Sequence, residues 1–170
     1  MKPLKYLFLM MLTFSACNSS QNVHNPAYSL LLKALYKNTV PSVNIEQLSN
    51  ELPTDSIVLL DSREQLEYEV SHLKNSIWVG YDVFDSTKVA SFPKDTAIVV
   101  YCSVGYRSER IGEKLQQMGF TNVYNLYGGI FEWANQTQEV LDSTETPTKK
   151  VHGFSKVWGI WLNKKVEKVY

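Results

Sequence analysis

Cysteine, histidine and net charge are all scarce in this chain. Only two cysteines and three histidines occur among its 170 residues. Because they form no cluster with metal-ligand spacing, no metal and no cofactor are expected. Lys and Arg together number 17, as do Asp and Glu, so the formal net charge is zero. A strongly basic domain is typical of nucleic-acid binding, and no nucleic-acid partner is therefore expected.

Residues 1–16 have the pattern of a secretory signal peptide. Two lysines precede an apolar stretch at residues 6–14, and small residues stand immediately before Cys17. The apolar stretch is too short for a membrane-spanning helix. The tetrad that ends at Cys17 resembles the bacterial lipobox, although Phe14 stands where leucine is commoner. An ordinary cleaved signal with an incidental cysteine is the alternative.

The lipobox resemblance implies that Cys17 is lipidated and becomes the mature N-terminus. The protein would then be exported and anchored to a bacterial membrane, facing the periplasm or the cell exterior. Residues 17–27 are polar and lack periodicity, which favours a flexible tether. If Cys17 is acylated, Cys102 has no partner left for an intramolecular disulfide.

Strand and helix patterns alternate along the rest of the chain, and this alternation predicts a parallel α/β sheet. Apolar runs predict strands at 42–45, 57–60, 76–79, 96–101 and 123–126. Helical spacing of apolar residues predicts helices at 28–36, 48–52, 64–70 and 107–119, and a short helix after Gly128 and Gly129. The expected domain covers residues 28–137.

Two segments follow this domain. Residues 138–147 are acidic and contain Ser and Thr, so a linker is expected there. Residues 148–170 form a basic and aromatic extension. Its Trp158 and Trp161 are expected to pack on the domain, because aromatic side chains usually bury area; contact with an anionic lipid surface is the alternative.

Cys102 stands where a buried strand ends and a helix begins. Open α/β sheets place their ligands at this edge. The start of a helix offers unpaired backbone N–H groups and a partial positive charge, which favour the nucleophilic thiolate. Gly105 permits a positive φ that turns successive N–H groups inward. A buried, inert cysteine is the alternative, but Gly105, Arg107 and the helix start favour a nucleophilic or persulfide-bearing cysteine.

Three blocks of sequence resemble the rhodanese (sulfurtransferase) family in its single-domain form, over about Val43 to Trp133. They are Leu59–Glu64, Glu67–Ile77, and the loop Cys102–Arg107 followed by Gly128-Gly129-x-x-x-Trp133. Two positions depart from the family pattern, because Ser71 and Asn75 stand where glycine is usual. Asn tolerates a positive φ, so the backbone is expected to survive the second change. The resemblance implies a small parallel sheet flanked by helices on both faces.

The resemblance also implies sulfane-sulfur transfer through a persulfide on Cys102. Ser103, Val104, Gly105, Tyr106 and Arg107 would then form the active loop. Four residues separate Cys102 from Arg107, whereas dual-specificity phosphatases have five. The smaller ring suits a sulfur atom better than a phosphoryl group, which disfavours a phosphatase or an arsenate reductase.

The other site residues receive supporting roles. Arg107 suits either an anionic donor or a carboxylate that orders the loop. Asp61 is implied as structural and Arg63 as support behind the loop. His72 is expected to be structural, since a thiolate already held by a helix end needs no neighbouring base. His24 and His152 are isolated.

The sequence leaves the partners open. A small sulfur compound is the expected donor, and a thiol or a cyanide-like nucleophile is the expected acceptor of a monomeric enzyme. The alternative is a rhodanese-like binding or persulfide-sensing module without turnover.

Overall fold

The computed structural model describes residues 23, 25–51, 57–136 and 139–170. The expected signal peptide and Cys17 lie outside this part, as does most of the expected tether. None of the helices in the described ranges is both long and apolar enough to cross a membrane.

Five parallel strands form the central sheet, in the order β1-β5-β4-β2-β3. They are β1 Ser42–Val43, β2 Ile57–Asp61, β3 Ile77–Trp78, β4 Ala97–Tyr101 and β5 Val123–Leu126. Within the register, Asp61 of β2 lies opposite Tyr101 of β4. Because the strands are parallel, the residues that follow β2 and β4 emerge at the same edge, as expected of an α/β fold.

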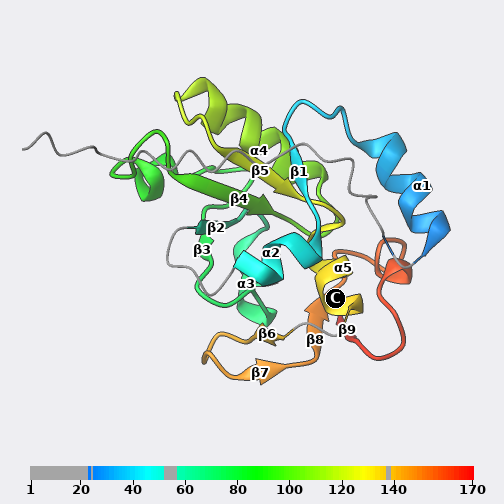
Figure 1. Cartoon of the computed structure of the whole chain (residues 1–170). Coiled ribbons are helices and arrows are strands. Elements are labelled where there is room, and N and C mark those ends of the chain that lie inside the picture. Colours follow the sequence, from blue (N-terminus) through cyan, green and yellow to red (C-terminus); the bar gives the residue numbers. More distant parts are fainter. Residues whose placement is uncertain (1–22, 24, 52–56, 137–138) are drawn as a thin grey trace, which may run out of the picture.

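Helices cover both faces of this sheet (Figure 1). They are α1 Pro26–Leu35, α2 Ile45–Glu51, α3 Gln65–Val70, α4 Tyr106–Gln117 and α5 Gly129–Asn135, with short 3-10 turns at η1 Ser86–Val89 and η2 Gly159–Trp161. Figure 1 shows α4 on one side of the sheet and α2 and α5 on the other. The expected α/β sheet with helices on both faces is confirmed.

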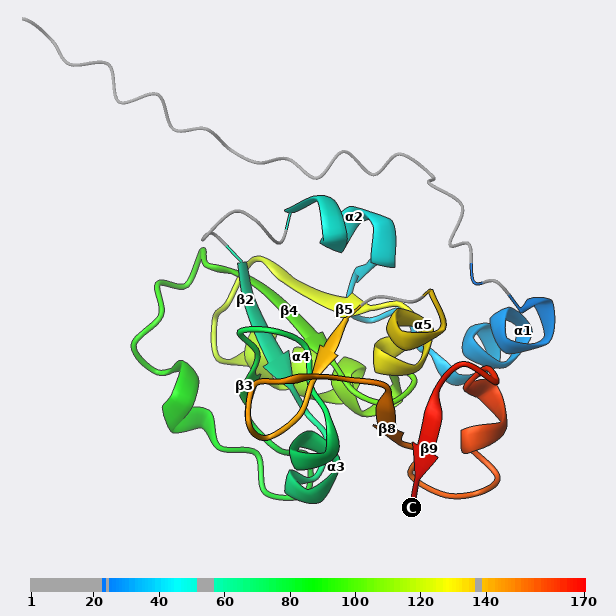
Figure 2. The same cartoon turned by 90° about the horizontal axis from the view of Figure 1, so that it is seen from below.

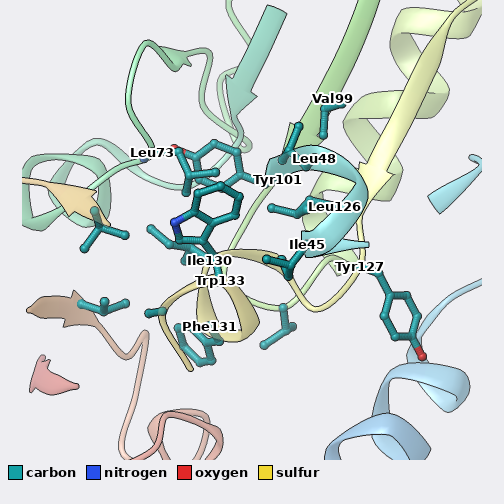
Figure 3. Packing of buried hydrophobic residues seen from close by; sticks show 14 of the residues in the cluster. Ile45, Leu48, Leu73, Val99, Tyr101, Leu126, Tyr127, Ile130, Phe131 and Trp133 are labelled. Carbon is teal, nitrogen blue, oxygen red and sulfur yellow. The ribbon is translucent and has the colours of Figure 1, made fainter. Parts of the chain in front are cut away.

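Side chains point alternately to the two faces of the sheet along each strand, and this alternation explains the two hydrophobic clusters. Leu59, Val99 and Tyr101 pack with α1, α2 and α5, whereas their neighbours Leu60, Ile98 and Val100 pack with α4. Successive side chains of a strand point to opposite faces, so one continuous apolar run supplies both cores. Figure 3 shows the first cluster, in which Ile130 and Trp133 of α5 gather with Tyr101 and Leu126 of the sheet.

The segment expected as a linker is instead a hairpin in which β6 Val140–Leu141 pairs antiparallel with β7 Pro147–Thr148. Val140 and Leu141 are buried, and the backbone of Leu141 exchanges two hydrogen bonds with His72, of 2.8 and 2.9 Å. Asp142 shapes the turn, because its Oδ1 accepts from the backbone N–H groups of Thr144 and Thr146. The Asp, Ser and Thr residues that suggest a linker are also turn-forming residues.

The C-terminal extension packs on the domain (Figures 1 and 2). Its β8 Lys150–His152 pairs in parallel with β9 Glu167–Val169. Trp158 and Trp161 are half-buried against the first cluster, and Trp161 stacks on Tyr28 of α1 with ring centroids 5.3 Å apart. Val151 and Leu162 belong to the cluster itself. The packing expected from the two tryptophans is present in the structure, so the extension contributes side chains to the domain's core.

Candidate active site

Cys102 follows the last residue of β4 and precedes α4, whose N-cap is Gly105. The thiol is almost fully buried, at 1 % exposure. The backbone N–H of Gly105 donates a hydrogen bond to the sulfur over 3.1 Å. The strand-to-helix position expected for Cys102 is therefore the observed one.

Hydrogen bonds from outside the loop turn its carbonyl groups away from the thiol. Four successive carbonyl oxygens each accept such a bond: Cys102 O from Ile130 N (2.9 Å), Ser103 O from Phe131 N (3.1 Å), Val104 O from Tyr36 Oη (2.7 Å) and Gly105 O from Asn125 Nδ2 (3.0 Å). Because burial raises the pKa of Tyr36 well above its ordinary value, its hydroxyl stays protonated and can donate. With these carbonyls engaged elsewhere, the Gly105 N–H is free to bind the sulfur, which suits an anionic sulfur species.

Two glycines make this arrangement possible. Gly105 has a φ of +100°, and a Cβ there would overlap the hydroxyl of Tyr36. Gly129 has a φ of +58°, and a Cβ there would overlap the carbonyl oxygen of Cys102. Glycine is thus required both inside the loop and in the segment that holds it from behind.

Arg107 forms a two-pronged ion pair with Glu67 of α3. Its Nη1 and Nη2 donate to the two carboxylate oxygens over 2.7 and 2.8 Å, and Ser103 Oγ donates to the same carboxylate over 2.9 Å. Burial alone would raise the pKa of Glu67, but hydrogen bonds from Arg107 and its charge outweigh that effect, so the pKa lies below its ordinary value. Of the two roles left open for Arg107, the contacts are those of a residue that orders the loop.

Asp61 and Arg63 form a fully buried pair. Arg63 Nη2 donates to Asp61 Oδ2 over 2.6 Å and to the carbonyl of Ser71 over 2.5 Å. The pair thereby connects the end of β2 to the end of α3, which fits the supporting roles implied for both residues.

The two departures from the family pattern have different local solutions. Ser71 is extended, with a φ of −169°, so its position does not require glycine in this chain. Asn75 has a φ of +60°, the positive value that asparagine was expected to tolerate.

Neither of the two described histidines, His72 and His152, takes part in the loop's hydrogen bonds. The ring of His72 stacks on Tyr68, its Nδ1 lies 3.2 Å from the carbonyl oxygen of Tyr68, and its Nε2 lies 3.2 Å from Glu145 Oε1. These contacts fit the structural role expected for it. His24 lies outside the described ranges. Within them, no group of three or more His, Cys, Asp or Glu side chains could hold a metal ion.

Glu67, Tyr36 and Asn125 bind the candidate loop, and these contacts were not predicted from the sequence. Glu67 belongs to the second family-like block, so an acidic residue in that block and an arginine in the loop are the signal that the sequence offers. Tyr36 lies 68 residues before its partner Val104, and Asn125 lies 20 residues after Gly105. No local pattern relates residues at such separations.

A cavity of about 530 Å³ contains Cys102. Ser103, Val104 and Arg107 of the loop also line it, together with Tyr106 at the start of α4. A second hollow of about 630 Å³ lies beside the β6–β7 hairpin and has no cysteine among its described lining residues. The loop cavity is therefore the one that concerns the chemistry of the thiol.

The loop, its ion pair and the parallel sheet are the features expected of a rhodanese-like domain, and the comparison with known families agrees. The chain belongs to the rhodanese family, because the Rhodanese-like domain model matches residues 44–136, more than half of its length.

The similar proteins include a much longer protein and shorter chains that the domain covers almost completely. A tRNA uridine(34) hydroxylase from Photorhabdus laumondii is 35 % identical over 99 residues, which cover 55 % of this chain but only 28 % of that protein. A crystal structure of a Bacillus halodurans protein is 25 % identical, with a TM-score of 0.57, and covers 70 % of this chain and 88 % of its own. The polysulfide-sulfur transferase of Wolinella succinogenes has the same fold at 21 % identity, with a TM-score of 0.54 over 68 % of this chain and 88 % of its own.

Proposed function

We propose that this protein is a sulfurtransferase that carries sulfane sulfur as a persulfide on Cys102. The Cys102 thiolate attacks the outer sulfur of a donor, the donor's S–S bond breaks, and its electron pair leaves with the remainder of the donor. The acceptor then attacks the outer sulfur of the persulfide and regenerates the thiolate. This is covalent catalysis in two steps.

The single observation that carries this proposal is the cradle around the sulfur. The Gly105 N–H lies 3.1 Å from Sγ, and four carbonyl groups are held outward by the protein. The Gly105 N–H and the N-terminal end of α4 stabilise a thiolate before transfer and a terminal persulfide anion after it.

The geometry of Arg107 supports sulfur transfer over phosphate chemistry. A phosphatase needs its arginine to bind the phosphoryl oxygens, whereas two N–H groups of Arg107 donate to Glu67 and a third donates to Ser103, which leaves fewer of its five donors for an oxyanion. The short loop between Cys102 and Arg107 favours the same conclusion. The matched segment covers only 28 % of the tRNA-modifying relative, so the hydroxylase activity named for that protein gives no support to a hydroxylase function here.

Intact-mass spectrometry tests the proposal directly. Incubation with thiosulfate, polysulfide or an organic persulfide is expected to add the mass of one sulfur atom at Cys102 with at least one donor. Cyanide should remove that sulfur as thiocyanate, and dithiothreitol should remove it as sulfide. A persulfide that forms but is never passed to an acceptor would instead favour a sensing module. Hydrolysis of a phosphate ester through Cys102, with no persulfide from any donor, would overturn the proposal.

We further propose that the protein is anchored to a membrane by a lipid on Cys17. The supporting pattern is the basic start, the short apolar stretch and the small residues before Cys17. Labelled palmitate is expected to enter the wild-type protein in cells, and Cys17→Ala should remove both the label and the membrane fractionation. Wild-type protein found unlabelled in the soluble fraction would contradict the assignment.

A further inference from the structure

The cavity around Cys102 has walls that come from outside the family-matched segment. Residues 44–136 supply the loop and Tyr81, but Leu35 precedes this segment, and Phe154 and Trp158 of the C-terminal extension follow it. The residues at the floor of this cavity are more buried than the residues at its rim. Cys102 and Val104 are buried, whereas Tyr106 and Phe154 are 43 % and 51 % exposed.

The wall contributed by the extension is fixed in place. Phe154 follows β8, and its backbone N–H donates to His152 Nδ1 over 3.1 Å. Its ring faces the guanidinium of Arg107, whose central carbon lies 5.1 Å from the ring centroid. Trp158 is half-buried against the core of the domain. Both aromatic residues therefore line the pocket in the folded chain.

The positive charge of the pocket is already paired with a carboxylate. Arg107 is the one cationic side chain among the described lining residues, and Glu67 pairs with it. Apart from Cys102, Ser103 and Arg107, the lining side chains are aliphatic or aromatic: Leu35, Tyr81, Val104, Tyr106, Phe154 and Trp158. A compact dianion such as thiosulfate would lose hydration here without gaining an unpaired cation. An apolar group would gain burial against these walls.

We propose that this pocket selects a sulfane-sulfur donor with an apolar alkyl or aryl body, and that Phe154 and Trp158 determine that specificity. The inference rests on the proposed sulfurtransferase function. The outer sulfur of the donor reaches Cys102 on the floor, while the apolar body lies between the aromatic walls.

A thiosulfonate series isolates the body of the donor from its reactive sulfur. The Cys102 thiolate attacks the outer sulfur of R–SO₂–S⁻, the S–S bond breaks, and the electron pair leaves with the sulfinate R–SO₂⁻. One thiolate and one thiosulfonate anion thus give one persulfide anion and one sulfinate anion. Thiosulfate reacts in the same way and releases sulfite. Benzenethiosulfonate, methanethiosulfonate and thiosulfate therefore differ mainly in the apolar group and the charge.

The measurement is the rate of Cys102 persulfide formation by the full chain in a single turnover, divided by each donor's rate with N-acetylcysteine. The normalised rate is expected to rise from thiosulfate through methanethiosulfonate to benzenethiosulfonate. Phe154→Ala and Trp158→Phe should each lower the benzenethiosulfonate rate on the order of tenfold, and should lower the thiosulfate rate by a much smaller factor. Ile160→Ala is the matched control, since Ile160 is in the same extension, is 63 % exposed and does not line the pocket.

The outcomes separate this inference from the function on which it rests. Persulfide formation at similar normalised rates with all three donors would overturn the apolar specificity and leave the sulfurtransferase intact. An equal loss with every donor in Phe154→Ala would show a general effect on the loop, and would also overturn the specificity role. No persulfide from any donor would refute the proposed function, and the specificity with it.

Discussion

Cys102→Ser is expected to reduce sulfur transfer to the uncatalysed background and to leave no persulfide on the protein. A serine hydroxyl ionises far less readily than a thiol and cannot hold a transferable outer sulfur. The exchange is nearly isosteric, and the Gly105 N–H that donates to Sγ can donate to a hydroxyl oxygen. The free energy of unfolding should therefore change by only about 1 kcal/mol. Turnover and thermal melting, measured on the same preparation, check both parts of the expectation.

Cys17→Ser is the matched control for this experiment, because it removes the other cysteine of the chain. It should keep full turnover in detergent solution. Residual transfer by Cys102→Ser would place the nucleophile elsewhere in the chain. A large loss of melting temperature in the same variant would mean that the sulfur also holds the fold together.

Glu67→Gln is expected to destabilise the domain by about 3 kcal/mol and to slow sulfur transfer. Removing one member of a buried ion pair leaves the other charge uncompensated. Arg107 would be that charge, and its side chain is only 12 % exposed. Ser103 would also lose its carboxylate acceptor, so the loop would be held less firmly. Urea denaturation and persulfide formation measure the two effects. Glu69→Gln is the control on the same helix, because Glu69 is exposed.

The cost of Glu67→Gln should also depend on pH. The pKa of Glu67 is lower in the folded protein than its ordinary value of 4.5, so the folded state favours the ionised carboxylate. Its contribution to stability is fully present above the pKa of the unfolded chain and is lost as the pH falls through the lower folded pKa. The stability difference between wild type and Glu67→Gln should be constant near neutrality and shrink below about pH 4.5. A difference that stays constant into acid would contradict the charged pair.

The sequence predicts the sheet well because the central strands β2 and β4 are almost wholly apolar and each is followed by a helix. Residues 57–60 and 96–101 predict β2 and β4 almost to the residue. The ends are less well defined, since α2 begins at Ile45, where the sequence favours the end of a strand. The hairpin at 140–148 is hidden, because its two buried residues stand among polar turn-forming residues that also suit a linker.

The reactive part of the site is local and therefore visible in the sequence. Cys102, Gly105 and Arg107 lie within six residues, and strand, loop and helix define their relation. What holds the loop is distant in sequence. Tyr36 reaches the loop from beyond α1, and Glu67 reaches it from α3. Phe154 enters the pocket from the extension. Such contacts follow only from the folded arrangement of the elements.

The family-matched segment does not include all the residues that support the cysteine loop and line its pocket. The matched segment, residues 44–136, contains the thiol and its arginine. Tyr36, which donates to Val104 and accepts from the Gly128 N–H, lies before that segment. Phe154 and Trp158 lie after it. If the matched segment alone were moved into another protein, it would carry the thiol and its arginine. It would lack the hydroxyl that supports the loop and the aromatic side chains that form one wall of the pocket. The family-matched segment is thus smaller than the part of the chain that forms the loop's support and the pocket. Donor selectivity can therefore evolve in the flanking segments while the cysteine loop stays the same.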